Sequence, residues 1–277
     1  MKTVCLLSLL LVACGGGGGG DATGGIDGGT SGDKDGSTTS GGAQPTALDV
    51  LSPAISDVVI EVDYQSTAAP YVGGGPFGRA DLWQVTEDNL VRVFHKSPKT
   101  LTVPHTLDKM QALSDIAGTT FTADQILAIA DAHRNEKSSG TKATFYIVFL
   151  DGYLQDGGGT EMSVIGVSIG NTGVIAMFKP VIASTGTGLG GSAMNVEQST
   201  LVHELGHGLG LVGNGVPTTS NHQDTPHGAH CTNTSCTMFW ENEGKSNAAA
   251  FAQQALGGSS DILFGSECLA DLDAVAH

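Results

Sequence analysis

The sequence predicts an α/β (α+β) fold with a mixed β-sheet upper lobe and a smaller, irregular lower lobe. Between residues 58 and 182, strand-like segments rich in β-branched residues alternate with segments whose apolar residues recur at helical spacing. Such alternation is typical of a sheet that is covered by helices. A further helix, expected over residues 195–210, closes the series and carries two histidines four residues apart.

The elements before that helix are predicted from their periodicity and from the residues at their ends. The expected strands are 58–64, 101–103, 144–150, 164–169 and 174–182, and the expected helices are 81–94 and 123–135. Thr122 is expected to cap the second of these helices. Asn195, followed by Gln198, is typical of a helix start, and Gly210 of a helix end.

Residues 203–207 read His-Glu-Leu-Gly-His. On a helix, His203 and His207 project from the same face because they are four residues apart. Two imidazoles so placed can bind one zinc ion, and Glu204 lies beside it, able to take a proton from a metal-bound water. Zinc lowers the pKa of that water to about 7. The motif predicts a zinc peptidase; the alternative is a chance match of five residues, against which the helical context argues.

A second catalytic pattern occurs at residues 166–170, which read Gly-Val-Ser-Ile-Gly and match the Gly-x-Ser-x-Gly of serine hydrolases. That motif requires a strand, a sharp turn at the serine and then a helix. Ser168 instead lies inside an apolar run that a turn and another strand-like segment follow. We therefore expect an edge strand beside the metal site, to which an extended peptide could add as a further strand.

The N-terminus has the features of an export signal. Residues 1–13 contain Lys2 and then a short apolar run, which is too short to span a membrane as a helix, and they are predicted to be a signal peptide. The ending Leu-Val-Ala-Cys resembles a bacterial lipobox, which implies that Cys14 becomes the lipid-modified first residue. Residues 14–49 are then a lipidated, disordered linker rich in Gly, Ser and Asp, and residues 50–277 the zinc peptidase domain.

These features predict a protein that is anchored by lipid to the bacterial cell envelope and faces the periplasm or the exterior. The alternative is an ordinary signal peptide that contains Cys14, which would give a secreted protein. The formal net charge of −16, from 28 acidic and 12 basic residues, argues against nucleic acid as a partner. The expected partners are a protein or peptide substrate and, through the lipid, the membrane; the protein is expected to be a monomer.

Five cysteines occur in the chain. Cleavage of the signal peptide removes Cys5, and lipidation occupies Cys14. The three that remain, Cys231, Cys236 and Cys268, are an odd number for an oxidising compartment. At least one thiol must therefore be free, bound to a metal or paired outside the chain.

Residues 203–210, His-Glu-Leu-Gly-His-Gly-Leu-Gly, resemble the metzincin zinc peptidases, whose pattern HExxHxxG precedes a third His or Asp ligand. In that clan the glycine turns the chain, the third ligand follows three residues later, and a methionine turn lies beneath the metal. In this chain the third position is Gly213, which offers no side chain. The resemblance implies a metzincin-like zincin fold, with the third ligand displaced.

The pattern resumes at His230-Cys231 and at Cys236-Thr237-Met238, which resembles the archaemetzincin branch, with its third histidine followed by Cys-x4-Cys-x-Met. This resemblance implies that residues 211–229 are an insertion, that His230 is the third ligand and that Met238 is the Met-turn residue. The archaemetzincin pattern ends in a Cys-x-x-Cys pair that completes a second, structural zinc site. Residues 265–268 read Gly-Ser-Glu-Cys, so only Cys268 of that pair is present. The three cysteines could hold a structural metal, or a Cys231–Cys236 or Cys236–Cys268 disulfide could form.

The insertion itself is rich in metal-binding side chains. His222, His227 and Asp224, in that order, are alternatives to His230 as the third zinc ligand. Two other interpretations are a second metal ion held by the 221–230 loop and a polar loop whose histidines face water.

The predicted function is that of a zinc-dependent endopeptidase that hydrolyses extracellular proteins or peptides, with one catalytic zinc ion and Glu204 as the general base. The alternative, from a different class, is a non-catalytic, metal-binding surface lipoprotein that retains the metzincin fold. Glu204 weighs against this alternative because a purely structural metal site needs no base.

Overall fold

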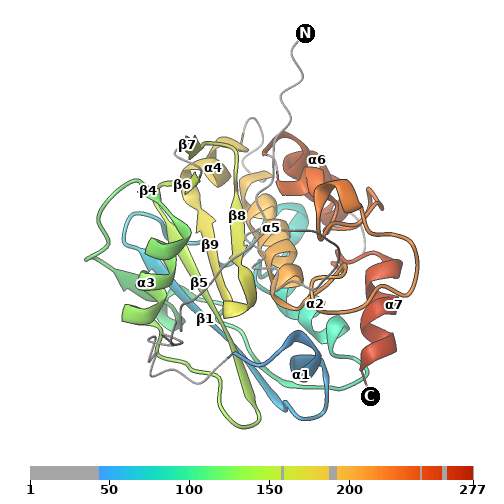
Figure 1. Ribbon diagram of the computed structural model, residues 1–277. Helices are drawn as coiled ribbons and strands as arrows, with labels where there is room; N and C mark the ends of the chain where they lie inside the picture. The colour runs from blue at the N-terminus through green and yellow to red at the C-terminus, as the bar shows by residue number, and fades with distance from the viewer. Residues whose placement is uncertain (1–43, 157–158, 187–191, 244, 258–260, 277) are drawn as a thin grey trace, which may run out of the picture.

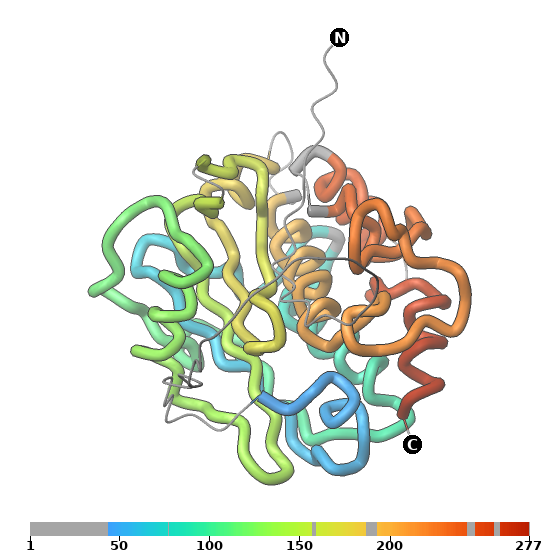
Figure 2. Tube along the Cα trace, viewed as in Figure 1, coloured from blue at the N-terminus to red at the C-terminus, as the bar shows by residue number. Residues whose placement is uncertain are grey.

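The computed structural model describes residues 44–156, 159–186, 192–243, 245–257 and 261–276 (Figures 1 and 2). The predicted mixed α/β fold is confirmed. The main sheet has the strand order β2-β1-β5-β9-β8, with β3 also paired to β1. Its strands are β1 Asp57–Gln65, β2 Thr100–Thr102, β3 Gln111–Leu113, β5 Lys142–Leu150, β8 Gly166–Ile169 and β9 Val174–Phe178. A second sheet, of order β4-β6-β7, consists of β4 Thr120–Phe121, β6 Tyr153–Asp156 and β7 Gly159–Glu161.

Strand β5 lies at the centre of the main sheet, and β8 lies at its end. The pairs that β1 makes with β2, β3 and β5 are parallel, as is the pair β5–β9, whereas β8 runs antiparallel to β9. Residues 143–150 of β5 are all buried, because a central parallel strand is covered on both faces. Among the described residues β8 pairs with β9 only, so the predicted edge strand is confirmed.

Helices cover both faces of the main sheet. Figure 1 shows α3 on one face and α2 and α5 on the other, with α6 and α7 beyond α5 in the irregular lower lobe. The α-helices are α1 Ala47–Leu51, α2 Gln84–Val93, α3 Ala123–His133, α4 Lys179–Ser184, α5 Ser192–Gly208, α6 Lys245–Leu256 and α7 Ser266–Val275. Short 3-10 turns are η1 Pro76–Gly78, η2 Leu107–Lys109, η3 Gly170–Thr172, η4 Thr225–His227 and η5 Trp240–Glu243.

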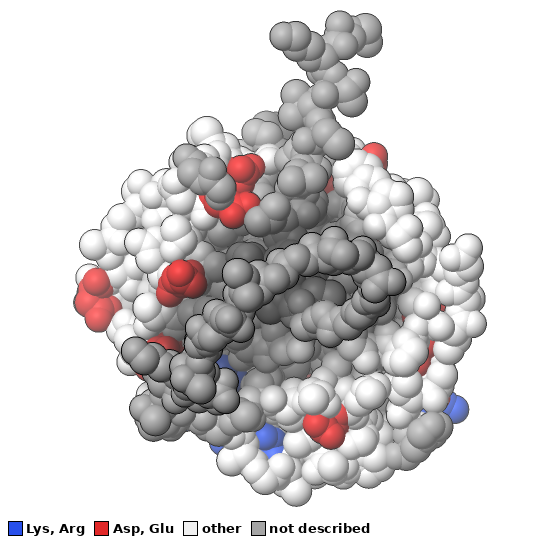
Figure 3. Space-filling model, viewed as in Figure 1, with Lys and Arg blue, Asp and Glu red and all other residues white. Residues whose placement is uncertain are grey.

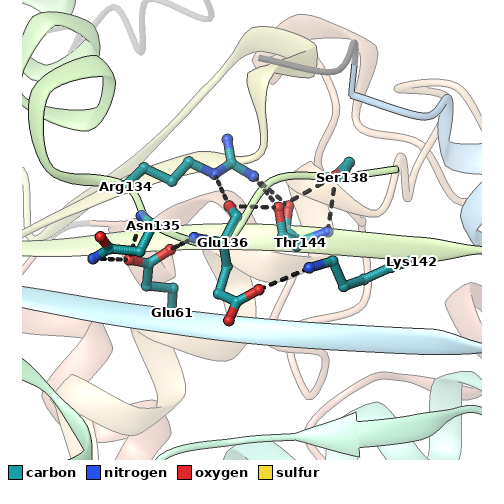
Figure 4. Close-up of polar contacts among 7 residues, drawn as sticks. All are labelled: Glu61, Arg134, Asn135, Glu136, Ser138, Lys142 and Thr144. Atoms are coloured by element: carbon teal, nitrogen blue, oxygen red, sulfur yellow. Dashed lines mark hydrogen bonds and ion pairs between the residues drawn. The ribbon is translucent and has the colours of Figure 1, made fainter. Parts of the chain in front are cut away.

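A polar cluster joins the segment after α3 to strands β1 and β5 (Figure 4). The Glu61 carboxylate accepts hydrogen bonds from the backbone N–H groups of Asn135 and Glu136, each at 2.7 Å. The Arg134 guanidinium donates to the carbonyl and the hydroxyl of Thr144. Because charge-assisted hydrogen bonds are the stronger class, this cluster fixes the α3–β5 connection against the sheet.

Some segments differ from the sequence-based predictions. Helix α1 begins at Ala47, because Thr46 and Asp49 form a capping box, so ordered structure starts before the predicted boundary at residue 50. The predicted strand 174–182 ends at Phe178 and continues as helix α4. Pro180, in the first turn of that helix, explains the change, since proline cannot donate to a sheet but suits a helix start. The predicted signal peptide, Cys14 and most of the predicted linker lie outside the described residues.

The face in Figure 3 carries more acidic than basic surface, as the net charge requires. No helix within the described parts of the chain is both long and apolar enough to cross a membrane.

Candidate metal centre

Helix α5 carries the His-Glu-Leu-Gly-His motif, as predicted, and ends at Gly208, one residue after it. The helix starts at Ser192, three residues before the predicted start at Asn195. Gly210 follows with a φ of +80°, which glycine adopts without a Cβ clash and which turns the chain away from the helix axis. His203 and His207 therefore sit on the last two turns, on one face, with their side chains buried.

Three imidazoles meet beside α5. Ligand nitrogens of His203, His207 and His230 all lie within 4.8 Å of one another, and the Nε2 atoms of His203 and His207 are 3.0 Å apart. Two nitrogens bound to one tetrahedral zinc ion at about 2.0–2.1 Å are separated by about 3.4 Å. The spacing of the three rings is therefore close to that of a three-histidine zinc site.

Backbone carbonyl groups orient two of the rings. The Nδ1 atoms of His203 and His230 lie 2.6 Å from the carbonyl oxygens of Thr237 and His227, respectively. A carbonyl oxygen only accepts, so each Nδ1 carries the hydrogen and each neutral ring keeps the Nε2 lone pair. Zinc-binding histidines show this arrangement, with the second ring nitrogen donating to a carbonyl or carboxylate. The residues present thus fit a zinc ion.

Met238 lies directly under the motif-bearing helix. Its side chain is fully buried, and a Cβ on Gly206 would overlap its Sδ atom. The same Cβ would be 3.0 Å from Cε1 of Phe264. Only glycine at position 206 allows α5 and the segment around Met238 to approach so closely, so the tight contact explains a helix-weakening residue within the motif.

Replacing Gly206 by alanine should destabilise the fold. Overpacking a buried contact costs about 1–3 kcal/mol. The gain in helix propensity from glycine to alanine returns about 1 kcal/mol. We expect a lower urea midpoint at an unchanged slope, and weaker zinc retention because α5 must shift. Gly159→Ala, on an exposed strand whose nearest atom would be 3.7 Å away, is the control and should change stability by less than about 0.5 kcal/mol. Equal midpoints for the two variants would contradict the packing argument.

Glu204 lies between helix α5 and strand β8. A Cβ on Gly166 of β8 would be 3.0 Å from Cγ of Glu204, so the glutamate stem packs against the backbone of the edge strand. The side chain is buried at 2% exposure. Glu204 thus stands beside the metal-binding histidines on one side and beside the sheet edge on the other. Ser168, the serine of the Gly-x-Ser-x-Gly pattern, lies within β8 rather than at a strand-to-helix turn.

The other side chains of the insertion do not join this group. His227 stacks on Trp240, with ring centroids 4.0 Å apart, and its Nδ1 lies 2.8 Å from Oδ2 of Asp224. His222 groups instead with Cys231 and Cys268. Gly213 supplies no ligand because it has no side chain; its φ of +78° favours glycine, and a Cβ there would be 2.9 Å from Oε1 of Gln223.

The three cysteines of the domain are free, buried thiols, so neither of the two disulfides considered from the sequence is formed. The Sγ atoms of Cys236 and Cys268 are 3.6 Å apart, well beyond the roughly 2.05 Å of a disulfide bond. Hydrogen bonds from the Cys236 and Cys268 thiols, in that order, hold the pKa of Cys231 far below its usual value. Cys231 is thus the thiol most readily ionised.

A buried ion pair holds the first half of α5, which the sequence did not suggest. Oε2 of Glu197 lies 2.5 Å from Nζ of Lys179, and its Oε1 accepts the backbone N–H of Tyr71 at 2.7 Å. Burial raises the pKa of Glu197 to about 7, although Lys179 and the Tyr71 N–H oppose this rise. Glu197, a charged residue at helical spacing from Leu201 and Leu205, was the one sequence signal of this pair. Its partner, Lys179, lies on a different element, α4.

No protein-family model matches the sequence, and no match is found among curated proteins. Two solved structures are similar. One is a zinc-dependent peptidase from Methanocorpusculum labreanum, with 12% identity, 77% of this chain and 99% of that chain covered, and a TM-score of 0.42. The other is an archaemetzincin from Methanopyrus kandleri, with 15% identity, 79% and 95% coverage, and a TM-score of 0.40.

The described residues contain two groups of side chains that could hold a metal ion. His203, His207 and His230 form one group, which the sequence pattern favoured, and His222, Cys231 and Cys268 form the other. The sequence placed the first group correctly. It did not associate His222 with the thiols, since 46 residues separate His222 from Cys268.

Proposed function

We propose that this protein is a zinc-dependent endopeptidase. The observation that carries the proposal is the convergence of the Nε2-presenting rings of His203 and His230 with His207, beside the carboxylate of Glu204. Three neutral imidazoles with an acidic residue next to them are a donor set for a catalytic rather than a purely structural zinc ion. One catalytic ion per chain is proposed for this centre.

The metal ion and the protein side chains would contribute different parts of the hydrolysis. A zinc ion held by His203, His207 and His230 would supply a Lewis acid and lower the pKa of water towards about 7. The Glu204 carboxylate accepts the proton of the attacking water and then delivers it to the nitrogen of the leaving amine. The Thr237 and His227 carbonyls keep His203 and His230 in the tautomer and orientation that present Nε2.

Strand β8 offers a way to orient the substrate. Its outer edge faces away from β9, and Glu204 packs against its backbone at Gly166. An extended peptide that adds to this edge would run its scissile bond past Glu204, while main-chain hydrogen bonds supply affinity with little demand on side-chain identity. A protein or peptide substrate therefore suits the site.

Removal of the metal tests the proposal. A chelator should abolish cleavage of an unfolded protein substrate by the purified protein, and added zinc should restore it. Mass spectrometry of the fragments distinguishes endopeptidase cleavage from removal of terminal residues. Undiminished cleavage by protein shown to be zinc-free would contradict the proposal.

We further propose that Cys14 carries a lipid that anchors the protein to the cell envelope, with the domain facing the periplasm or the exterior. The Leu-Val-Ala-Cys ending and the glycine-rich segment after it support this proposal. Cys14→Ser should move the protein from the membrane fraction to the soluble fraction on cell fractionation. Cys5→Ser, within the predicted signal peptide, serves as the matched cysteine control and should remain with the membrane. Membrane association of the Cys14→Ser protein would contradict the lipid anchor.

A further inference from the structure

A second group of metal-binding side chains lies in the lower lobe, outside the three-histidine centre. It consists of His222 from the insertion, Cys231 and Cys236 on either side of a short loop, and Cys268 from α7. All four side chains are buried, with exposures of 4% or less. Buried cysteines pack as small apolar residues, but the buried His222 ring beside them is a polar group that apolar packing does not require.

The distances within the group resemble those of a tetrahedral site. The ligand atoms of His222, Cys231 and Cys268 lie within 4.8 Å of one another, and the Sγ atoms of Cys236 and Cys268 are 3.6 Å apart. Nδ1 of His222 is 3.4 Å from Sγ of Cys231. Two sulfur ligands of one tetrahedral zinc ion, at Zn–S distances of about 2.3 Å, are separated by about 3.8 Å. The thiols are thus spaced for a shared ion.

Asp271 fixes the orientation of the His222 ring. Its Oδ2 accepts a hydrogen bond from Nε2 of His222 at 2.6 Å, which leaves the lone pair of Nδ1 directed at the thiols. Oδ1 of Asp271 accepts the backbone N–H and the hydroxyl of Thr219. A buried carboxylate that holds the far nitrogen of a histidine is the usual outer partner of a zinc-binding imidazole.

Backbone N–H groups complete the environment of the sulfurs. Gly265 donates to Sγ of Cys236 at 3.0 Å, and Asn233 donates to Sγ of Cys231 at 3.4 Å. Such bonds stabilise the thiolate form that binds metal. Position 265 has no room to supply a ligand of its own, since a Cβ on Gly265 would be 3.0 Å from the Cβ of Cys236. The remaining corner of the site is filled by His222.

We propose that His222, oriented by Asp271, completes a structural zinc site with Cys231, Cys236 and Cys268. The 211–229 insertion then serves to bring its own ligand to the lower lobe. The site also adjoins the catalytic centre through the backbone, because Cys231 follows His230 and Cys236 precedes Thr237, whose carbonyl orients His203. The ion thus ties the insertion, the 231–238 segment and α7 together behind the three histidines.

Zinc content and cobalt spectra of the purified protein test this proposal independently of peptidase activity. The native protein should contain two zinc ions per chain. Cobalt replacement should give thiolate-to-cobalt charge-transfer absorption, which a site of histidines alone cannot produce. In His222→Ala the content should fall to one ion and the charge-transfer band should weaken or vanish. His222→Cys should restore two ions, because a fourth thiolate can occupy the same corner.

Two further variants separate a ligand from a residue that merely packs nearby. Asp271→Asn should keep both ions but weaken zinc affinity at the thiol site by about 10- to 100-fold, as expected for the loss of an outer partner. His227→Ala, a histidine of the same insertion outside the group, should keep the charge-transfer band unchanged.

The proposal is overturned if the native protein lacks thiolate-to-cobalt absorption, if alkylation of the denatured, unreduced protein detects a disulfide among the three cysteines, or if His222→Ala retains two ions with an unaltered band. The first two outcomes need no variant, so they hold even if a substitution prevents folding. If the native protein held zinc at the thiol site but none at the three-histidine centre, the proposed peptidase function would be overturned and the thiol site would stand.

Discussion

The Glu204→Gln protein should lose peptide hydrolysis by about 10²- to 10⁴-fold, the range that a general base contributes. Glutamine keeps the length and nearly the shape of the side chain that packs against Gly166 of β8. It cannot accept the proton of the attacking water, so the loss should fall on kcat. Zinc content and thermal stability should equal those of the native protein, because the three histidines and their carbonyl partners are unchanged.

The measurement compares kcat and KM on one peptide, together with zinc content. Glu161→Gln provides a matched control: the same chemical change on β7, away from the histidines, should leave both kinetic constants as they are. Full activity of Glu204→Gln would show that another group accepts the proton. Inactivity accompanied by loss of zinc would assign Glu204 to metal binding or to folding instead of proton transfer.

The His230→Ala protein should lose the ion from the three-histidine centre and with it all measurable cleavage. The loss of an outer partner already weakens metal affinity by about 10- to 100-fold, so the loss of a ligand should cost more than about 100-fold. His230 is fully buried, and its ring lies 5.3 Å, centroid to centroid, from that of His203 and 4.9 Å from that of His207. Removing it leaves two histidines four residues apart, which are too few for a catalytic zinc site.

Competition with a chromophoric chelator would measure this loss as a change in zinc affinity. The matched comparison is His227→Ala, because His227 lies three residues away and contacts His230 only through its backbone carbonyl among the bonds described here. That variant should lose less than tenfold in zinc affinity. If His227→Ala lost the catalytic ion while His230→Ala retained it, the third ligand would be misassigned.

Local sequence patterns predicted the helices and strands that surround the site. The strand at 144–150 and the capped helix after Thr122 appear as β5 and α3, because β-branched runs and capping residues act over a few neighbouring positions. The shorter elements, such as β3, β4 and β7, were not predicted. Each has two or three residues and exists because a neighbouring strand is present to pair with it.

The residues of the metal centre also fall into those that local sequence predicts and those that it does not. Two ligands and the base lie within one turn and a half of helix, so helical geometry alone brings His203, Glu204 and His207 together. The insertion offered His222, Asp224 and His227 as alternatives to His230 for the third position, and periodicity could not rank the four, since irregular chain has no period. Only the packing of residues 222–238 against α5 and α7 separates His230, beside the first two histidines, from His222, beside the thiols.

The sequence alone thus determined the α/β class, the motif-bearing helix and the presence of Cys231, Cys236 and Cys268, because these depend on residues near one another along the chain. The tertiary structure decided which histidine meets which group, that the thiols are unpaired and close, and that Asp271 and Glu197 serve as buried partners. His222 and Asp271 are 49 residues apart in the sequence, and Glu197 is 126 residues from Tyr71, whose N–H it accepts. These contacts form only when distant segments of the chain fold together, and no local pattern encodes that long-range packing.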